Sequence, residues 1–181
     1  MRPHNYSDEG FVLSRRNFGE ADRLLSLYTK NNGRISLIAK GVRRPKSKKR
    51  GHIEVFTLVK FQANQGRGID IMTEAEVVED FAQIRMSLKK VSLAYYISEV
   101  VGKITHESEP NTQLFNLIHT IFTKLKTTKL LRALRQDFIL KLLTLTGFWP
   151  EGKVMTNHDT ELAEVVERQI HSERVGKIML K

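Results

Sequence analysis

Residues 23–39, Arg23-Leu-Leu-Ser-Leu-Tyr-Thr-Lys-Asn-Asn-Gly-Arg-Ile-Ser-Leu-Ile-Ala39, read as two short strands around a tight turn. In the first half Leu25, Leu27 and Thr29 alternate with Ser26 and Tyr28, which is typical of a strand with one buried face. The centre, Asn31-Asn32-Gly33, supplies residues that tolerate the positive φ of hairpin turns. The stretch therefore predicts a β-hairpin with strands at 23–29 and 34–39.

Three more strand-like runs flank this hairpin, at 11–18, 53–61 and 69–78. The run at 53–61 alternates, with Val55, Thr57, Val59 and Phe61 on one face. We expect five short antiparallel strands, whose apolar faces and open edges must be covered by closure or packing. The economical prediction for residues 1–80 is an OB-type β-barrel, a fold that commonly binds oligonucleotides.

The apolar period lengthens to that of a helix from about Arg85 onward. A first helix is expected there, a second after Pro110-Asn111, a third at about 128–146 ending near Gly147, and a last at about 160–172. The buried face of the first is predicted to hold Leu88, Val91, Ala94, Tyr95, Val101 and Ile104. The sequence thus predicts an α+β fold, a five-stranded OB-type barrel followed by an all-helical domain at 81–181 that packs on it.

Positive charge gathers between the third and fourth expected strands, in Lys40-Gly-Val-Arg-Arg-Pro-Lys-Ser-Lys-Lys-Arg50. Seven of these eleven residues are cationic, and the whole chain has a net charge of +10. Clustered Lys and Arg residues that neutralise phosphates release counterions, which favours a nucleic acid as the partner. The alternative is a solvated loop whose charges only keep the chain soluble.

The candidate DNA-binding residues follow from this cluster. Phosphate contacts are predicted for the cations of the loop, with two additions on nearby elements: Lys40, Arg43, Arg44, Lys46, Lys48, Lys49 and Arg50, then Arg34 and Arg67. Base stacking is expected of an aromatic on the outer face of the barrel. Among Phe11, Phe18, Tyr28, Phe56 and Phe61, the parity of Tyr28 and Phe56 makes these two the predicted stacking residues.

Features of catalysis are weak in this sequence. The acidic pair Glu20 and Asp22 is compatible with a metal-dependent nuclease, but it lies in a predicted turn, where Asp and Glu bind local N–H groups and arginines. The six histidines are scattered and the chain has zero cysteines, so we expect no metal site and no catalysis. No run of eighteen apolar residues and no apolar N-terminal core occur, so a cytoplasmic protein is expected.

Several short segments of the N-terminal half closely resemble the RecO family of bacterial recombinational-repair mediators. They are Asp8-Glu-Gly-Phe-Val-Leu13, Phe18-Gly-Glu-Ala-Asp-Arg-Leu-Leu25, Gly33-Arg-Ile-Ser36 and Ala39-Lys-Gly-Val-Arg-Arg-Pro-Lys-Ser47. In the helical half, Ala94-Tyr-Tyr-Ile-Ser-Glu99 is the best match. The resemblance implies an OB fold, a helical domain and a non-enzymatic DNA-binding activity, which anneals strands and helps to load RecA onto single strands coated by SSB.

The same resemblance implies RecR and SSB as partners. Many relatives carry a cysteine zinc site after the helix that ends here near Gly147, and because this chain has no cysteine, no zinc is inferred. A second basic cluster, Lys126, Lys129, Arg132 and Arg135, is either a solvated helix face or a site for the acidic tail of SSB. A nuclease and an RNA-binding OB protein remain the alternatives, since charge alone does not distinguish DNA from RNA.

Overall fold

The computed structural model describes residues 4–45, 47 and 51–166. The chain forms two compact units, one of residues 1–80 with 105–111, and one of residues 81–104 with those from 112 onward. The segment 105–111 belongs to the first unit although it lies between two helices in the sequence.

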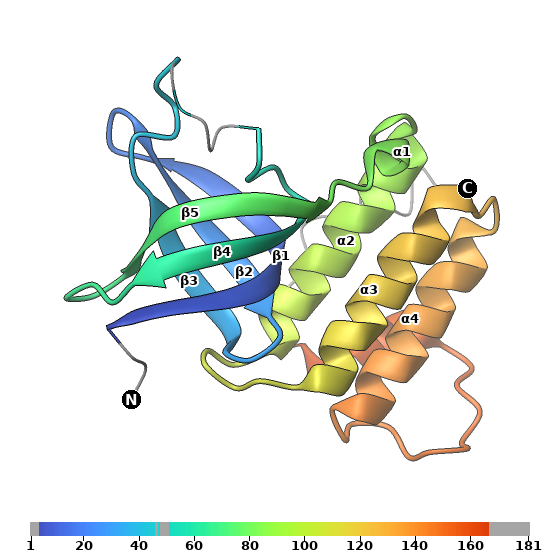
Figure 1. The fold of residues 1–181 in the computed structure, drawn as a ribbon. Helices are drawn as coiled ribbons and strands as arrows, with labels where there is room; N and C mark the ends of the chain where they lie inside the picture. The colour runs from blue at the N-terminus through green and yellow to red at the C-terminus, as the bar shows by residue number, and fades with distance from the viewer. Residues whose placement is uncertain (1–3, 46, 48–50, 167–181) are drawn as a thin grey trace. The chain divides into compact units, whose positions relative to one another are not determined.

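The first unit is a closed barrel of five strands in the order β1-β2-β3-β5-β4 (Figure 1). Their bounds are Asn5–Phe18 for β1, Asp22–Thr29 for β2, Gly33–Ala39 for β3, Leu58–Asn64 for β4 and Asp70–Glu79 for β5. The predicted OB-type barrel is therefore confirmed. One detail differs, because β3 pairs with β5 in parallel. A closed ring with an odd number of strands requires at least one parallel pair, so the expected all-antiparallel arrangement is impossible.

The predicted hairpin forms as the sequence indicates. Leu25 and Leu27 are fully buried in the barrel core, and Gly33 opens β3 with φ +64°. Asp8, itself 5% exposed, accepts hydrogen bonds from the side-chain amides of Asn31 and Asn32 at 2.9 and 2.7 Å. The buried carboxylate therefore fixes the turn. Without these two amides it would be left with fewer hydrogen-bond partners in a position that water reaches poorly.

The fourth strand begins later than predicted, at Leu58 instead of residue 53. Residues 56 and 57 instead exchange backbone hydrogen bonds with Val12, where β1 has a bulge, and Phe56 has φ +65°. The sequence alternates through this irregular segment, but its burial does not, since Ile53, Phe56 and Thr57 are the buried residues there. Period alone therefore cannot mark where the strand begins.

Five helices make up the described part of the second unit: α1 Ala82–Arg85, α2 Leu88–Ile104, α3 Thr112–Thr127, α4 Leu131–Leu145 and α5 His158–Val165. The predicted stripe of α3, from Leu114 to Leu125, is buried. On α2 the predicted face is wrong in part, since Leu88 and Tyr95 are exposed while Leu93, Tyr96 and Ile97 are buried. Apolar residues occupy two adjacent stripes of α2, so the pattern fits either face.

The end of α4 matches the sequence signal closely. Gly147 has φ +78°, its N–H bonds the carbonyl of Thr144, and the Phe148 N–H bonds that of Leu143. These two bonds form a Schellman motif, which satisfies carbonyls that a helix end leaves open. Across the described parts of both units, the helices are too short or too polar to cross a membrane.

Candidate nucleic-acid interface

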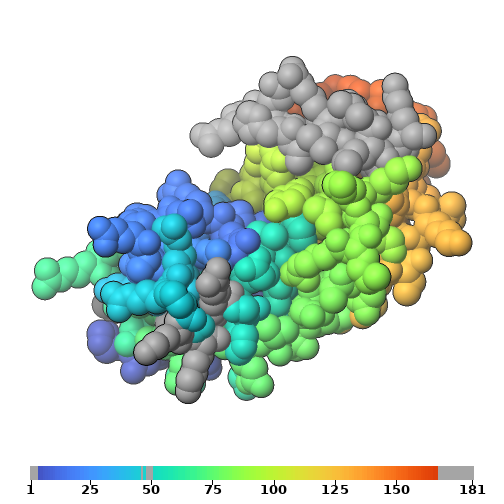
Figure 2. All heavy atoms as spheres, turned by 90° about the horizontal axis from the view of Figure 1, so that it is seen from above, coloured from blue at the N-terminus to red at the C-terminus, as the bar shows by residue number. Residues whose placement is uncertain are grey.

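The start of the basic loop is fixed to the turn between β1 and β2. The N–H of Gly41 donates to Asp22 Oδ1 at 2.7 Å, and the N–H of Arg43 donates to the Ala21 carbonyl at 2.9 Å. Val42, between them, is fully buried in the barrel core. Figure 2 shows the teal residues after β3 beside the blue residues of this turn. The cations that follow β3 are therefore carried by an anchored segment.

The far end of the loop is also held. His52 Nδ1 lies 2.8 Å from the Ala75 carbonyl, and Ile53 is fully buried in the core. Glu54 accepts a hydrogen bond from Arg15 at 2.6 Å and lies 3.6 Å from Arg23. The acid of this segment thus pairs with barrel arginines, which leaves the cations of the loop uncompensated by it.

The structure exposes the predicted cations of the loop that it describes, Lys40, Arg43 and Arg44. Arg43 Nη1 donates to the carbonyls of Glu20 and Gly19 at 3.0 and 3.3 Å, which orients its guanidinium over the turn. Four further candidates lie outside the described residues: Lys46, Lys48, Lys49 and Arg50.

The predicted stacking residues are wrong. Tyr28 is fully buried and Phe56 is 2% exposed, so neither ring offers a face to a base. Tyr28 has the outward parity that the sequence indicates, but it is buried all the same, and its hydroxyl donates a long hydrogen bond to the Asn111 carbonyl at 3.4 Å. Phe56 lies in the irregular segment before β4 and has φ +65°, so strand parity does not set the direction of its side chain.

The segment 105–111 binds along β3. Arg34 Nε donates to the Thr105 carbonyl at 3.1 Å, and the Ser108 N–H donates to the Arg34 carbonyl at 2.9 Å. Arg34 Nη1 also lies 3.4 Å from Glu107 Oε1. At Gly33 a β-carbon would clash with the backbone of Glu109, so glycine is needed there for the close approach as well as for the turn. Arg34, a predicted phosphate ligand, is thus engaged within its own unit.

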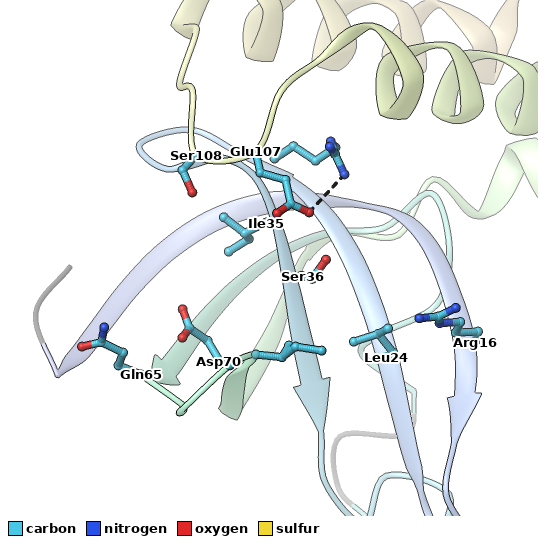
Figure 3. Close-up of a pocket in the computed structure, with 11 residues that line it drawn as sticks. Arg16, Leu24, Ile35, Ser36, Gln65, Asp70, Glu107 and Ser108 are labelled. Carbon is cyan, nitrogen blue, oxygen red and sulfur yellow. Dashed lines mark hydrogen bonds and ion pairs between the residues drawn. The ribbon is translucent and has the colours of Figure 1, made fainter. Parts of the chain in front are cut away.

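A hollow of about 490 Å³ lies on the outer face of β1, β2 and β3, next to the turn between β4 and β5 (Figure 3). In OB folds this face and the adjoining loops bind oligonucleotides. Its lining residues are Arg16, Leu24, Arg34, Ile35, Ser36, Gln65, Gly68, Ile69, Asp70, Glu107 and Ser108. The hollow therefore lies on the face of the barrel that corresponds to the oligonucleotide-binding face of other OB folds.

The turn between β4 and β5 borders this hollow and presents Arg67, another predicted phosphate ligand, to solvent. Asp70 holds the turn, because its carboxylate accepts the Gly66 N–H at 3.2 Å and the Tyr6 hydroxyl at 2.8 Å. A β-carbon at Gly66 would clash with the Ile69 carbonyl. Arg67 is consequently displayed from a constrained turn.

Charge in the hollow is balanced. Arg16 and Arg34 line it together with Asp70 and Glu107, so two cations face two carboxylates. The excess of positive charge lies instead on the basic loop, and at Arg67 in the turn that borders the hollow. Arg16, which is exposed on β1, is not among the residues predicted from the sequence. The alternation of β1 could have indicated Arg16, because it pairs with Leu24 on the outer face of the barrel.

The second basic cluster is divided by the structure. Lys129 and Arg132 are exposed and line a hollow of about 400 Å³ together with Lys89 and Leu130, which is 73% exposed. Arg135 is committed elsewhere, because it forms an ion pair with Asp159 and lies 4.4 Å from the centre of the Tyr96 ring. Lys126 lies 5.8 Å from the centre of the Phe81 ring. A compact patch of all four cations is therefore wrong.

The acidic pair Glu20 and Asp22 contributes to the structure of the turn between β1 and β2. Asp22 accepts the Gly41 N–H, and Glu20 contributes its backbone carbonyl to Arg43. In the described part of the chain, no group of three or more His, Cys, Asp or Glu side chains is placed to hold a metal ion.

Comparison with known proteins agrees across both units. Residues 1–81 match the family model described as Recombination protein O N terminal, and residues 85–161 match Recombination protein O C terminal. The chain is similar to proteins named DNA repair protein RecO from three organisms. It is 37% identical to that of Pelotomaculum thermopropionicum over 145 residues, 80% of this chain and 56% of the relative.

Identity to the Desulforamulus reducens protein is 33% over 165 residues, 91% of this chain and 63% of the relative. Identity to the Dehalococcoides mccartyi protein is 31% over 156 residues, which are 86% of this chain and 62% of the relative. The chain thus spans about three fifths of the length of the curated relatives that it matches. With the N-terminal model on its barrel and the C-terminal model on its helices, the chain belongs to the RecO family.

Proposed function

We propose that this chain takes part in DNA repair as a DNA-binding recombination mediator without catalytic activity. In this role it anneals complementary strands and helps to load RecA onto single strands that SSB covers. The observation that carries the proposal is the exposed cationic segment after β3, anchored at both ends on a RecO-family barrel.

The barrel is the DNA-binding unit in this proposal. The described cations that contact phosphates are Lys40, Arg43 and Arg44 on the basic loop, and Arg67 in the turn that borders the outer-face hollow. Phosphate contacts of this kind give affinity and register without sequence preference. That property suits a protein that must act on any damaged sequence.

The helical unit is the partner-binding part. Lys129 and Arg132 beside the exposed Leu130 offer charge and an apolar contact to the acidic tail of SSB, whose aromatic end needs both. RecR is the second direct partner, and RecA is affected through the SSB-coated strand. The cytoplasm, at the nucleoid, is the location that this activity requires.

A strand-annealing assay tests the proposal. Two complementary oligonucleotides are mixed with the chain, first bare and then coated with SSB, and duplex formation is followed by fluorescence energy transfer. We expect faster annealing in both cases, with a larger relative gain on the coated strands. A chain with Lys40, Arg43 and Arg44 replaced by Ala should lose the gain. Equal annealing rates with and without the unchanged chain would contradict the proposal, and degradation of the strands in the presence of Mg²⁺ would indicate a nuclease instead.

A further inference from the structure

Phe18 is the last residue of β1, and its side chain is 44% exposed. The other four aromatics of the expected strands, Phe11, Tyr28, Phe56 and Phe61, are each at most 2% exposed. An aromatic that keeps nearly half of its surface in water contributes little to the core. Phe18 therefore has an accessible ring that the barrel does not need for its packing.

The strand register places this ring on the binding face. Arg16 pairs with Leu24 and Phe18 pairs with Asp22, so Arg16 and Phe18 point to the same side of β1. Arg16 and Leu24 line the outer-face hollow, and Arg16 is drawn at its edge in Figure 3. Phe18 lies two residues further along the strand, about 7 Å beyond Arg16.

A second guanidinium is bound by the turn that directly follows Phe18 in the chain. The turn that begins with Gly19 supplies the carbonyls that bind Arg43 Nη1. The exposed ring of Phe18 thus follows Arg16 on the strand and precedes the turn whose carbonyls bind Arg43. A cation, an aromatic and a cation in this order match the alternation of phosphate and base along a single strand.

We infer that Phe18 is the base-stacking residue of the barrel, and that the path from the outer-face hollow over Phe18 to Arg43 takes an unpaired strand. The inference rests on the proposed function, because it assigns a contact within that DNA-binding surface. Stacking on one aromatic is sequence-tolerant, and duplex bases, which are already stacked, do not offer it. The contact therefore favours single-stranded over double-stranded nucleic acid.

The test compares two probes, a single-stranded oligothymidylate and an abasic strand with the same number of phosphates. The variants are Phe18→Ala, Phe18→Leu, which keeps apolar bulk, and Phe18→Trp, which restores a ring. Phe148→Ala is the matched control, since Phe148 is an exposed aromatic of the helical unit. Because Trp149 is the single tryptophan, Phe18→Trp combined with Trp149→Phe also reports stacking by fluorescence.

We expect Phe18→Ala and Phe18→Leu to weaken oligothymidylate binding by roughly 5- to 150-fold, the equivalent of about 1–3 kcal/mol for one stacked base. Binding of the abasic strand should stay the same in these variants. Phe18→Trp should bind both probes like the unchanged chain. In the Phe18→Trp, Trp149→Phe double variant, the tryptophan fluorescence should be quenched by the oligothymidylate and not by the abasic strand. Equal losses on both probes, or no loss on either, would overturn the inference. If the unchanged chain binds neither probe, the proposed function itself fails, which is a different result.

Discussion

The backbone N–H of Gly41 donates a hydrogen bond to Asp22 Oδ1 at 2.7 Å, which links two segments nineteen residues apart. Gly41 follows β3 and has φ +65°, whereas Asp22 opens β2. The bond holds the first residues of the basic loop against the turn between β1 and β2. Phe18 directly precedes this turn, and Asp22 directly follows it. The basic loop is therefore fixed to the turn between β1 and β2, and Asp22 holds it there together with the Ala21 carbonyl, which accepts the Arg43 N–H.

Replacing Asp22 by Ala should destabilise the barrel by about 1–2 kcal/mol, because the change removes a hydrogen bond to a charged acceptor at a partly exposed site. Denaturant unfolding measures this loss, and amide hydrogen exchange at Gly41 should become faster. Asp22→Asn, which keeps a carbonyl oxygen, is the matched control and should lose less. Unchanged exchange at Gly41 in the Ala variant would show that the bond does not hold the loop.

The basic loop should set the salt dependence of DNA binding. With Lys40, Arg43 and Arg44 replaced by Ala, the slope of log affinity against log salt should fall by up to about 0.7 for each phosphate of a single strand that is no longer neutralised. The control removes equal charge from the helical unit, through Lys124, Lys141 and Lys153. A slope that changes equally in both variants would mean that net charge matters and the loop does not.

Glu107→Gln should tighten DNA binding. The change removes one of two carboxylates from the outer-face hollow and the ionic partner of Arg34 Nη1, which lies 3.4 Å from Glu107 Oε1, while the bond of Arg34 Nε to the Thr105 carbonyl stays. We expect a gain of up to about fivefold at low salt, the equivalent of roughly 1 kcal/mol for an exposed charge pair. Titration of a labelled single strand measures it, with Glu164→Gln in α5 as the control. Weaker binding would mean that the ion pair builds the site instead of opposing it.

Tyr28 should make the barrel less stable at high pH. Burial raises the pKa of the Tyr28 hydroxyl above its ordinary value of about 10, because the charged form is disfavoured away from water. Its contribution is fully present below pH 10 and is lost as the pH rises, since the unfolded chain then releases the proton first. The free energy of unfolding should fall more steeply above pH 10 in the unchanged chain than in Tyr28→Phe. Parallel pH profiles would contradict this.

Charge reversal at Lys129 and Arg132 should weaken binding of an SSB tail peptide more than binding of bare DNA. The two side chains line a hollow with the exposed Leu130, which provides a compact site for a short acidic peptide. Fluorescence anisotropy of the labelled peptide measures the loss, and Lys141→Glu is the control, since Lys141 lies on α4 with Arg132. Should DNA affinity fall while peptide affinity holds, the patch would belong to the nucleic-acid surface.

The sequence by itself determined the order and kind of most elements. Alternation in residues 23–39, with Gly33 at the turn, is a local property, and the hairpin forms where it predicts. The stripe of α3 and the glycine end of α4 are local as well. The segments that resemble the RecO family are also continuous stretches of sequence, so the family could be identified without coordinates.

Only the tertiary structure decided which outward-facing residues are accessible. Parity places Tyr28 outside the barrel, but the folded chain buries it, and its hydroxyl bonds the carbonyl of Asn111, 83 residues later. Arg135 has helical spacing with Arg132, but its partner Asp159 comes from α5, 24 residues away. Periodicity tells which residues share a face, because it follows from the geometry of one element. What covers that face depends on contacts between distant segments, and for this reason Phe18 emerged as the exposed ring only in the folded chain.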